Sequence, residues 1–240
     1  MPIRVRRSIE DMKEGRARLI RAAEALFARS GIDGASLREI ANAAGQRNHN
    51  AVQYHFGTRD GLVEAIFSAR MWQMEKHRAE MLSEAGRRDR LSDVRALAEI
   101  VFLPQLLLDD PDGSHSYALF LSQFLLRNSR EAFGDFGAEL PPNLERTLVL
   151  LRAQLDFLSE PAAQRRLLTA CFMFLNMLAG QGAQGGTESF RDALEDTLEQ
   201  IVVALCLRPT SAAILSSSVG NLPTERSSSS GKMSSALNEF

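Results

Sequence analysis

Apolar residues in the first 70 positions recur every three to four residues, which is the spacing of amphipathic α-helices. The first such stripe consists of Leu19, Ile20, Ala23, Leu26 and Phe27. It predicts a helix that ends at Ser30-Gly31, because glycine commonly follows a helix C-terminus. A second short helix is expected from Ser36, since Ser36-Leu37-Arg38-Glu39 fits the capping-box pattern.

The same pattern continues through the rest of the chain. A third short helix is expected from about Asn48 to His55, and a fourth after its capping residue Thr58. Five more helices are expected near residues 91–108, 115–130, 142–158, 161–180 and 187–208. Period-2 alternation is not convincing anywhere and β-branched residues are sparse. The chain is therefore expected to be all-α.

Composition divides the expected helices into two domains. We expect a three-helix helix-turn-helix head at 16–60 and a separate helical bundle at 61–208. Residues 1–15 are expected to be a basic, flexible arm, and 10 of the 32 residues from 209 to 240 are Ser. Such a tail buries too little apolar surface to offset its ordering entropy, so we expect disorder there.

The charge is unevenly distributed. Residues 1–60 hold 11 Lys and Arg against 7 Asp and Glu, whereas the other 180 hold 17 against 23, which gives the net charge of −2. A basic head on an acidic body is expected if only the head meets a polyanion. A chance fluctuation in surface charge is the alternative.

Other classes of function find little support in the sequence. The only cysteines, Cys171 and Cys206, lie in apolar helical patterns and predict buried thiols in a reducing cytoplasm. The apolar run at 167–180 is too short for a bilayer, which needs roughly 20 residues. The G-x-G-x-x-G match at 180–185 follows a helix instead of a strand, so it predicts a loop. The sequence predicts no metal site, no cofactor, no catalytic residue and no enzyme.

Residues 36–59 carry the most informative chemistry. Two short helices joined by Ala44-Gly45 form a helix-turn-helix pattern, whose second helix lies in the major groove of DNA. If Asn48 caps that helix, His49, Asn50 and Gln53 share its outer face, since successive residues turn by about 100°. Asn and Gln can pair bidentately with adenine. The alternative is a solvated surface helix, although such helices usually carry Glu and Lys, and Asn is a poor helix former.

Neighbouring polar residues are better placed for phosphates, because a helix N-terminus attracts anions. The full predicted DNA-binding set is Ser36, Arg38, Arg47, Asn48, His49, Asn50, Gln53, Tyr54, Thr58 and Arg59. The basic residues Arg4, Arg6 and Arg7 are expected to be disordered, with a minor-groove arm as the alternative.

The segments LIRAAEALFARSGIDGASLREIANAAG and AVQYHFGTRDGLVEAIF together resemble the head of TetR-family transcriptional repressors. The resemblance covers residues 16–67. It implies a capping role for Ser36, a turn at Gly45, a closing aromatic pair of Tyr54 and Phe56, and Arg59 where the family commonly has a phosphate-contacting Lys. Gln46-Arg47 departs from the family, which usually has a hydrophobic residue and then Ser or Thr. This departure predicts a turn one residue longer, with Asn48 as the cap.

The resemblance also implies partners for the body. A small apolar effector is expected to contact Phe120, Gln123, Phe124, Phe172 and Asn176. Two apolar stripes predict either core or a homodimer interface: Leu168, Cys171, Leu175, Leu178, Leu194, Leu198, Ile201 and Leu205. We therefore expect a cytoplasmic, ligand-responsive regulator, most simply a repressor, that binds double-stranded DNA at a palindromic operator. The alternative is a helical ligand-binding or protein-interaction module that does not bind DNA.

Overall fold

The structure is a computed structural model that describes Ile9 and residues 12–48, 50–108, 115–127, 140–181 and 189–209. The chain divides into two units, residues 1–207 and 208–240, and every described helix lies in the first. The described residues form α-helices and one 3-10 helix and contain no strand, which confirms the expected all-α class. Arg4, Arg6, Arg7, the glycines of residues 182–186 and the tail from residue 210 lie outside the described residues.

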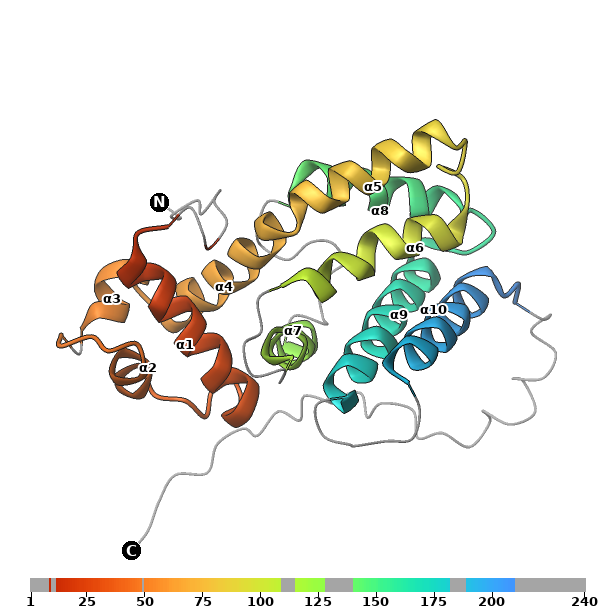
Figure 1. Cartoon of the computed structure of the whole chain (residues 1–240). Helices are drawn as coiled ribbons and strands as arrows, with labels where there is room; N and C mark the ends of the chain where they lie inside the picture. Colours follow the sequence, from red (N-terminus) through yellow and green to blue (C-terminus); the bar gives the residue numbers. More distant parts are fainter. Residues whose placement is uncertain are drawn as a thin grey trace, which may run out of the picture. The chain divides into compact units, whose positions relative to one another are not determined.

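Three helices build the head: α1 (Glu14–Ser30), α2 (Leu37–Ala43) and α3 (Ala51–Phe56) (Figure 1). The predicted stripe of α1 faces inward, and Ile20 and Phe27 are fully buried. α1 ends where the sequence predicts, with Gly31 at φ 84°, in the left-handed region that glycine adopts at little cost. Ile40 of α2 and Val52 of α3 complete this core, which fixes the three helices against one another.

The stretch from Arg59 to Arg87 forms two helices where the sequence predicts one. α4 (Arg59–Gln73) packs against α1 and α3, and α5 (Glu75–Arg87) continues beyond a turn at Met74. Met74 donates its N–H to Arg70 O at 3.2 Å, so the chain changes direction with little loss of hydrogen bonding. α4 therefore leads from the head into the body (Figure 1).

Five further helices and one 3-10 helix form the body. They are α6 (Val94–Phe102), η1 (Leu103–Leu107), α7 (Ser116–Arg127), α8 (Pro142–Ala153), α9 (Glu160–Gln181) and α10 (Phe190–Cys206). The expected helix at 91–108 is split because Pro104 has no N–H to donate, and the chain tightens into η1. α9 and α10 pack side by side, as Figure 1 shows, and α7 packs against both α1 and α9.

The head and the body share one continuous core. Phe27 of α1 stacks on Phe120 of α7 with ring centroids 6.3 Å apart, and Phe67 of α4 stacks on Phe124 of α7 at 4.6 Å. Aromatic pairs at these spacings stabilise beyond the area that they bury. A movement of α7 is therefore felt directly by α1. In the part of the chain that the structure describes, no helix combines the length and the hydropathy needed to cross a membrane.

Candidate nucleic-acid interface

The first helix of the helix-turn-helix begins at a complete capping box. Ser36 Oγ accepts a hydrogen bond from Glu39 N at 3.1 Å, and Glu39 Oε2 accepts one from Ser36 N at 2.8 Å. The backbone hydrogen bond from Ser36, and then its hydroxyl, hold the pKa of Glu39 below its usual value. The predicted role of Ser36 as a cap is present in the structure. Its side chain is thereby committed to orienting α2.

The turn between α2 and α3 is tied to α1. Gly45 adopts φ 65°, and Gln46 N donates to Ala41 O at 2.9 Å. The side chain of Gln46 donates from Nε2 to Gly15 O at 3.4 Å. Gln46, which stands where the resembling family usually has a hydrophobic residue, thus holds the turn against the N-terminal end of α1.

α3 begins later than predicted, at Ala51, and Asn48 does not cap it. Asn48 Oδ1 accepts from Asn50 N at 2.9 Å, so this amide bonds its own backbone two residues on. Such local bonds compete with helix formation, which explains the later start. Asn50 occupies the N-cap position, and its side chain makes no capping hydrogen bond. The amide of Asn50 is therefore not committed to the helix.

The two faces of α3 differ sharply in exposure. Ala51 and Val52 are buried on a helix that packs against α2 and α4, whereas Asn50 and Gln53 are exposed. Tyr54 is 82% exposed and packs edge-on against His55 at 5.0 Å. A tyrosine this exposed is unusual, because aromatic rings normally bury most of their area. His49 lies outside the described residues.

The start of α4 is braced against the loop between α1 and α2. Thr58 Oγ1 accepts from Gly61 N at 3.0 Å, so Thr58 caps α4 as predicted. Arg59 Nη1 donates to Ile32 O at 2.6 Å and to Ala35 O at 2.5 Å. This contact could not be predicted from the sequence, because it joins residues 24 and 27 positions apart. One end of the Arg59 guanidinium therefore positions the loop, and a phosphate contact would use the remaining N–H groups.

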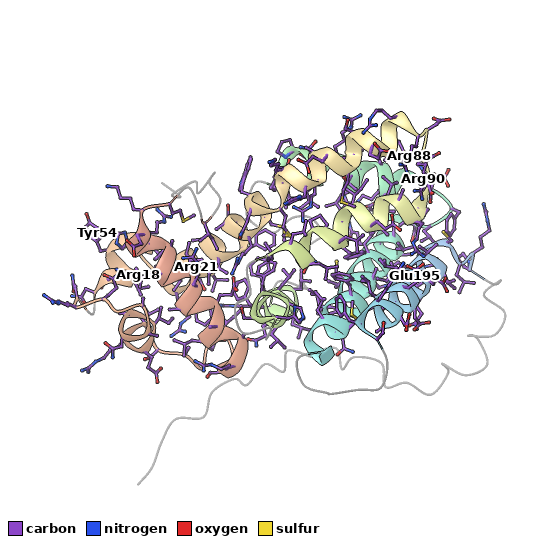
Figure 2. The ribbon with its side chains drawn as sticks, viewed as in Figure 1. Arg18, Arg21, Tyr54, Arg88, Arg90 and Glu195 are labelled. Atoms are coloured by element: carbon purple, nitrogen blue, oxygen red, sulfur yellow. The ribbon has the colours of Figure 1, made fainter. Side chains whose placement is uncertain are left out.

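Exposed basic side chains lie beside this face. Arg38 and Arg47 are exposed, as are Arg18 and Arg21 on α1, which lie on the same side of the molecule as Tyr54 (Figure 2). Arg18 pairs with Glu14 at 3.7 Å, an exposed pair of small energetic weight. Arg18 and Arg21 were not among the predicted DNA-binding residues, although their positions on the polar side of α1 follow from its apolar stripe.

Comparisons with known proteins agree with this geometry. Residues 19–66 match the family model described as "Bacterial regulatory proteins, tetR family". Residues 19–66 form a TetR-family domain. The match includes Ser36, Gly45, Tyr54 and Arg59, the positions on which the resemblance rests.

Two relatives of this chain come from Pseudomonas putida. The "Probable HTH-type transcriptional regulator ArpR" and the "HTH-type transcriptional regulator TtgR" are each 33% identical over 105 residues. The matched segment is 44% of this chain and spans about half, 49%, of each relative. The solved structure of a transcriptional regulator from Rhodococcus sp. Rha1 is 25% identical, with a TM-score of 0.42 over 81% of this chain and 99% of that one.

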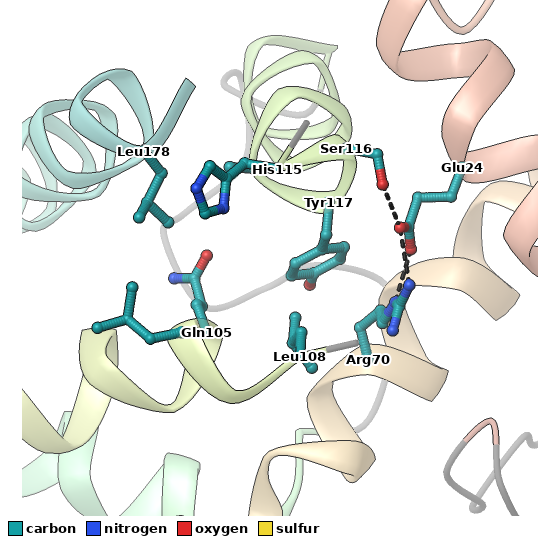
Figure 3. Close-up of a pocket in the computed structure, with 10 residues that line it drawn as sticks. Glu24, Arg70, Gln105, Leu108, His115, Ser116, Tyr117 and Leu178 are labelled. Atoms are coloured by element: carbon teal, nitrogen blue, oxygen red, sulfur yellow. Dashed lines mark hydrogen bonds and ion pairs between the residues drawn. The ribbon is translucent and has the colours of Figure 1, made fainter. Parts of the chain in front are cut away.

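A cavity of about 200 Å³ lies where the TetR-family domain meets the body. Figure 3 shows Glu24 of α1 and Arg70 of α4 on one side and Gln105 and Leu178 on the other. Arg70 donates from Nε and Nη2 to the two carboxylate oxygens of Glu24, at 2.6 and 2.8 Å. Ser116 of α7 adds a hydrogen bond to Glu24 at 2.8 Å. Three helices therefore meet at one buried carboxylate.

The predicted ligand contacts lie elsewhere. None of Phe120, Gln123, Phe124, Phe172 and Asn176 lines this cavity or the smaller apolar cavity at Cys171. Phe120 and Phe124 are buried in the aromatic stacks, and Asn176 is exposed. Gln123 accepts from Ile32 N at 3.1 Å and donates to Ala28 O at 3.4 Å, so it joins α7 to the end of α1. The polar side chain of Gln123, in the otherwise apolar α7, therefore bonds a neighbouring part of the same chain.

Most of the predicted dimer stripe is core of the single chain, which is the alternative that the sequence left open. Leu175, Leu178, Leu198, Ile201 and Leu205 are each at most 2% exposed. Leu168, Cys171 and Leu194 are half-buried against the same core. The stripes of α9 and α10 face each other, with α7 packed on α9 and α6 packed on α10, because apolar faces within one chain are covered first. An interface with a second copy would use the opposite faces of these helices.

Two further expectations concern the cysteines and metals. Cys171 lines an apolar cavity, and burial raises the pKa of its thiol to about 12. Cys206 is exposed, so the prediction of a second buried thiol is wrong. It lies at the last residue of α10, one position beyond the buried Leu205. Among the described residues, His, Cys, Asp and Glu nowhere gather in a group of three suited to a metal ion.

Proposed function

We propose that this chain is a sequence-specific DNA-binding transcriptional regulator. The observation that carries the proposal is the outer face of α3, where Asn50, Gln53 and Tyr54 are exposed on a helix that packs against α2 and α4. Side-chain amides can pair bidentately with adenine in the major groove. Arg38 and Arg47 are exposed and can donate hydrogen bonds to phosphates.

The proposed regulator acts as a homodimer on a palindromic operator, because a helix-turn-helix head reads one half-site and a two-fold dimer reads two. The exposed stripes of α9 and α10 support a dimer surface. Thr169 and Asn176 are exposed on α9, and the side chain of Val203 on α10 is 63% exposed. These outward faces are not used by the core of the single chain, so they are available to a second copy.

We propose that a ligand in the interior cavity weakens operator binding. The cavity is lined by Glu24 from the head and by Gln105, Ser116 and Leu178 from the body, so an occupant contacts both. A ligand shifts the equilibrium between two conformers only by its difference in affinity for them. A conformer that moves α7 displaces α1 through Gln123 and Ser116, and the two heads then no longer match the half-sites.

A gel shift with the DNA upstream of the chain's own gene tests the proposal, at two salt concentrations. The expected result is a shift that weakens steeply with salt, because each phosphate contact releases bound counterions. Absence of any salt-sensitive shift with upstream or genomic DNA contradicts the proposal. That outcome favours a helical ligand-binding or protein-interaction module.

A further inference from the structure

Arg78 of α5 is a buried cation that none of the described carboxylates bonds directly. Its side chain is among the largest fully buried ones, with the residue 1% exposed. Nη1 donates to Met71 O at 3.1 Å, Nη2 approaches the sulfur atoms of Met74 at 3.6 Å and Met71 at 3.9 Å, and Nε has no hydrogen-bond partner. Thioether sulfur is a weak acceptor. A buried guanidinium is costly unless it is paired, and here it is paired poorly.

The acidic residue that influences Arg78, Glu75, does not neutralise it by direct contact. Glu75 Oε1 accepts hydrogen bonds from Asn143 N at 2.6 Å and from Asn143 Nδ2 at 2.8 Å. Glu75 Oε2 has no hydrogen-bond partner, so neither oxygen is bonded to the guanidinium. Arg70 is the opposite case, since both of its bonds to Glu24 are charge-assisted. Burial lowers the pKa of Arg78 to about 10, so it remains charged at neutral pH.

Arg78 lines a second, smaller cavity of about 50 Å³. Apart from Arg78 and Gln105, its lining is apolar, with Phe67, Phe102 and Leu121 among its walls. Gln105 lines both this cavity and the larger one of about 200 Å³. The two cavities therefore adjoin at Gln105.

Two more unpaired polar atoms face this region. Gln105 Oε1 and the Tyr117 hydroxyl are buried without a hydrogen-bond partner. Tyr117 lines the larger cavity and lies close enough to Arg78 to influence it electrostatically. The region thus offers two donors, Arg78 Nε and the Tyr117 hydroxyl, that lack an acceptor. Buried polar groups are rarely left unpaired in a resting structure, so these atoms mark a place for a ligand.

We propose that the adjoining cavities bind a small aromatic carboxylic acid, with its carboxylate on Arg78 and Tyr117 and its ring in the larger cavity, against Leu106, Leu108 and Leu178. A carboxylate is the acceptor that fits a guanidinium best, because it can accept two parallel N–H bonds. An apolar cavity of about 150 Å³ binds benzene, so the larger cavity has room for one ring and a short chain. This inference names the chemical class of the effector and rests on the proposed function for its regulatory role.

The test is calorimetric titration of the full chain with 3-phenylpropionate and with 3-phenylpropionamide, which has the same shape without the charge. We expect the acid to bind wild-type protein at least about tenfold more tightly than the amide, as a charge-assisted pair in a buried site requires. Arg78→Met should reduce that ratio to about one. Arg87→Met, the same change at an exposed position of α5, should leave it unaltered.

Three results would overturn the inference: no saturable binding of the acid, equal binding of acid and amide by wild-type protein, or an acid preference that survives Arg78→Met. Methionine is an unbranched apolar side chain suited to the apolar pocket, and the change removes the desolvation cost of a poorly paired charge. Tyr117→Phe provides a second variant that keeps the ring. It should weaken binding of the acid several-fold and of the amide less, because the hydrogen bond to a carboxylate is charge-assisted, and equal effects on both ligands would count against the assignment.

The titration is read without DNA, so it fails independently of the proposed function. Acid-selective binding by a chain that shifts no DNA would contradict the regulator and retain the site. A salt-sensitive gel shift by a chain that does not distinguish acid from amide would contradict the site and retain the regulator.

Discussion

Arg70 of α4 and Glu24 of α1 form a two-point ion pair in the interior, with N–O distances of 2.6 and 2.8 Å and side chains only 5% and 2% exposed. The pair joins the head to the first helix of the body, and Ser116 connects it to α7. It also forms a wall of the larger cavity. One interaction therefore links head, body and cavity.

Glu24→Leu alone is predicted to destabilise the chain by about 3–5 kcal/mol, because it leaves the Arg70 guanidinium buried without its carboxylate. Glu24→Leu combined with Arg70→Met should recover most of that loss, since neither member of the pair is then left as a buried charge without its partner. Urea denaturation of the wild type, both single variants and the double variant measures the coupling. Additive losses would show that the two side chains do not act as a pair.

The capping box of α2 makes stability depend on pH in a defined direction. The pKa of Glu39 is lower in the folded chain than its ordinary value of 4.5. The stability that the Glu39 carboxylate adds to the folded chain is therefore fully present above pH 4.5. It is lost as the pH falls through the lowered folded pKa, because protonation removes the acceptor charge. Glu39→Gln should therefore lower the melting temperature at pH 7 and have less effect at pH 3. An equal effect at both pH values would exclude a charge contribution.

Local features of the head were predictable because short-range chemistry determines them. The capping box at Ser36, the glycine stop at Gly31 and the cap at Thr58 depend on residues no more than four positions apart. The start of α3 was not predicted, because the bond from Asn48 Oδ1 to Asn50 N competes with a cap that the residue type allows equally well.

Features that depend on distant contacts were not predictable. An apolar stripe such as Leu198, Ile201 and Leu205 has the same pattern whether it packs within the chain or against a second copy. In the sequence, Arg78 looks like an ordinary surface residue of a charged helix. Only the fold shows that Glu75 Oε1 is bonded to Asn143 of α8 and not to the Arg78 guanidinium. The helix-turn-helix could therefore be located from sequence, whereas the cavity could not.

The two thiols should react at very different rates. Cys206 is exposed, whereas burial raises the pKa of Cys171 to about 12, so almost no thiolate is present there at pH 8. Ellman's reagent is expected to titrate one thiol per native chain rapidly and the second only in denaturant. Cys206→Ser should abolish the rapid phase, and a rapid phase that persists in this variant would show that Cys171 is accessible.

Arg47 and Arg59 should differ in what their removal changes. Arg47 is exposed, so Arg47→Ala is expected to weaken binding to all DNA sequences and to leave the melting temperature unchanged. The slope of log affinity against log salt concentration should fall by about one, the value of a single phosphate contact. Arg59 holds the carbonyls of Ile32 and Ala35, so Arg59→Ala should also lower the melting temperature. Gel shifts over a salt series, with thermal unfolding of the same samples, separate the two roles. Identical behaviour of both variants would contradict the positioning role of Arg59.

The outer face of α3 is tested most directly by selecting bound sequences from random DNA with the wild type, Asn50→Ala and Gln53→Ala. We predict an enriched palindrome with two half-sites about one helical turn apart. Each variant should relax the preference at particular base pairs in both half-sites, by about 1–3 kcal/mol of discrimination. No enrichment with the wild type, or an unchanged consensus with both variants, would contradict the assignment of this face to DNA reading.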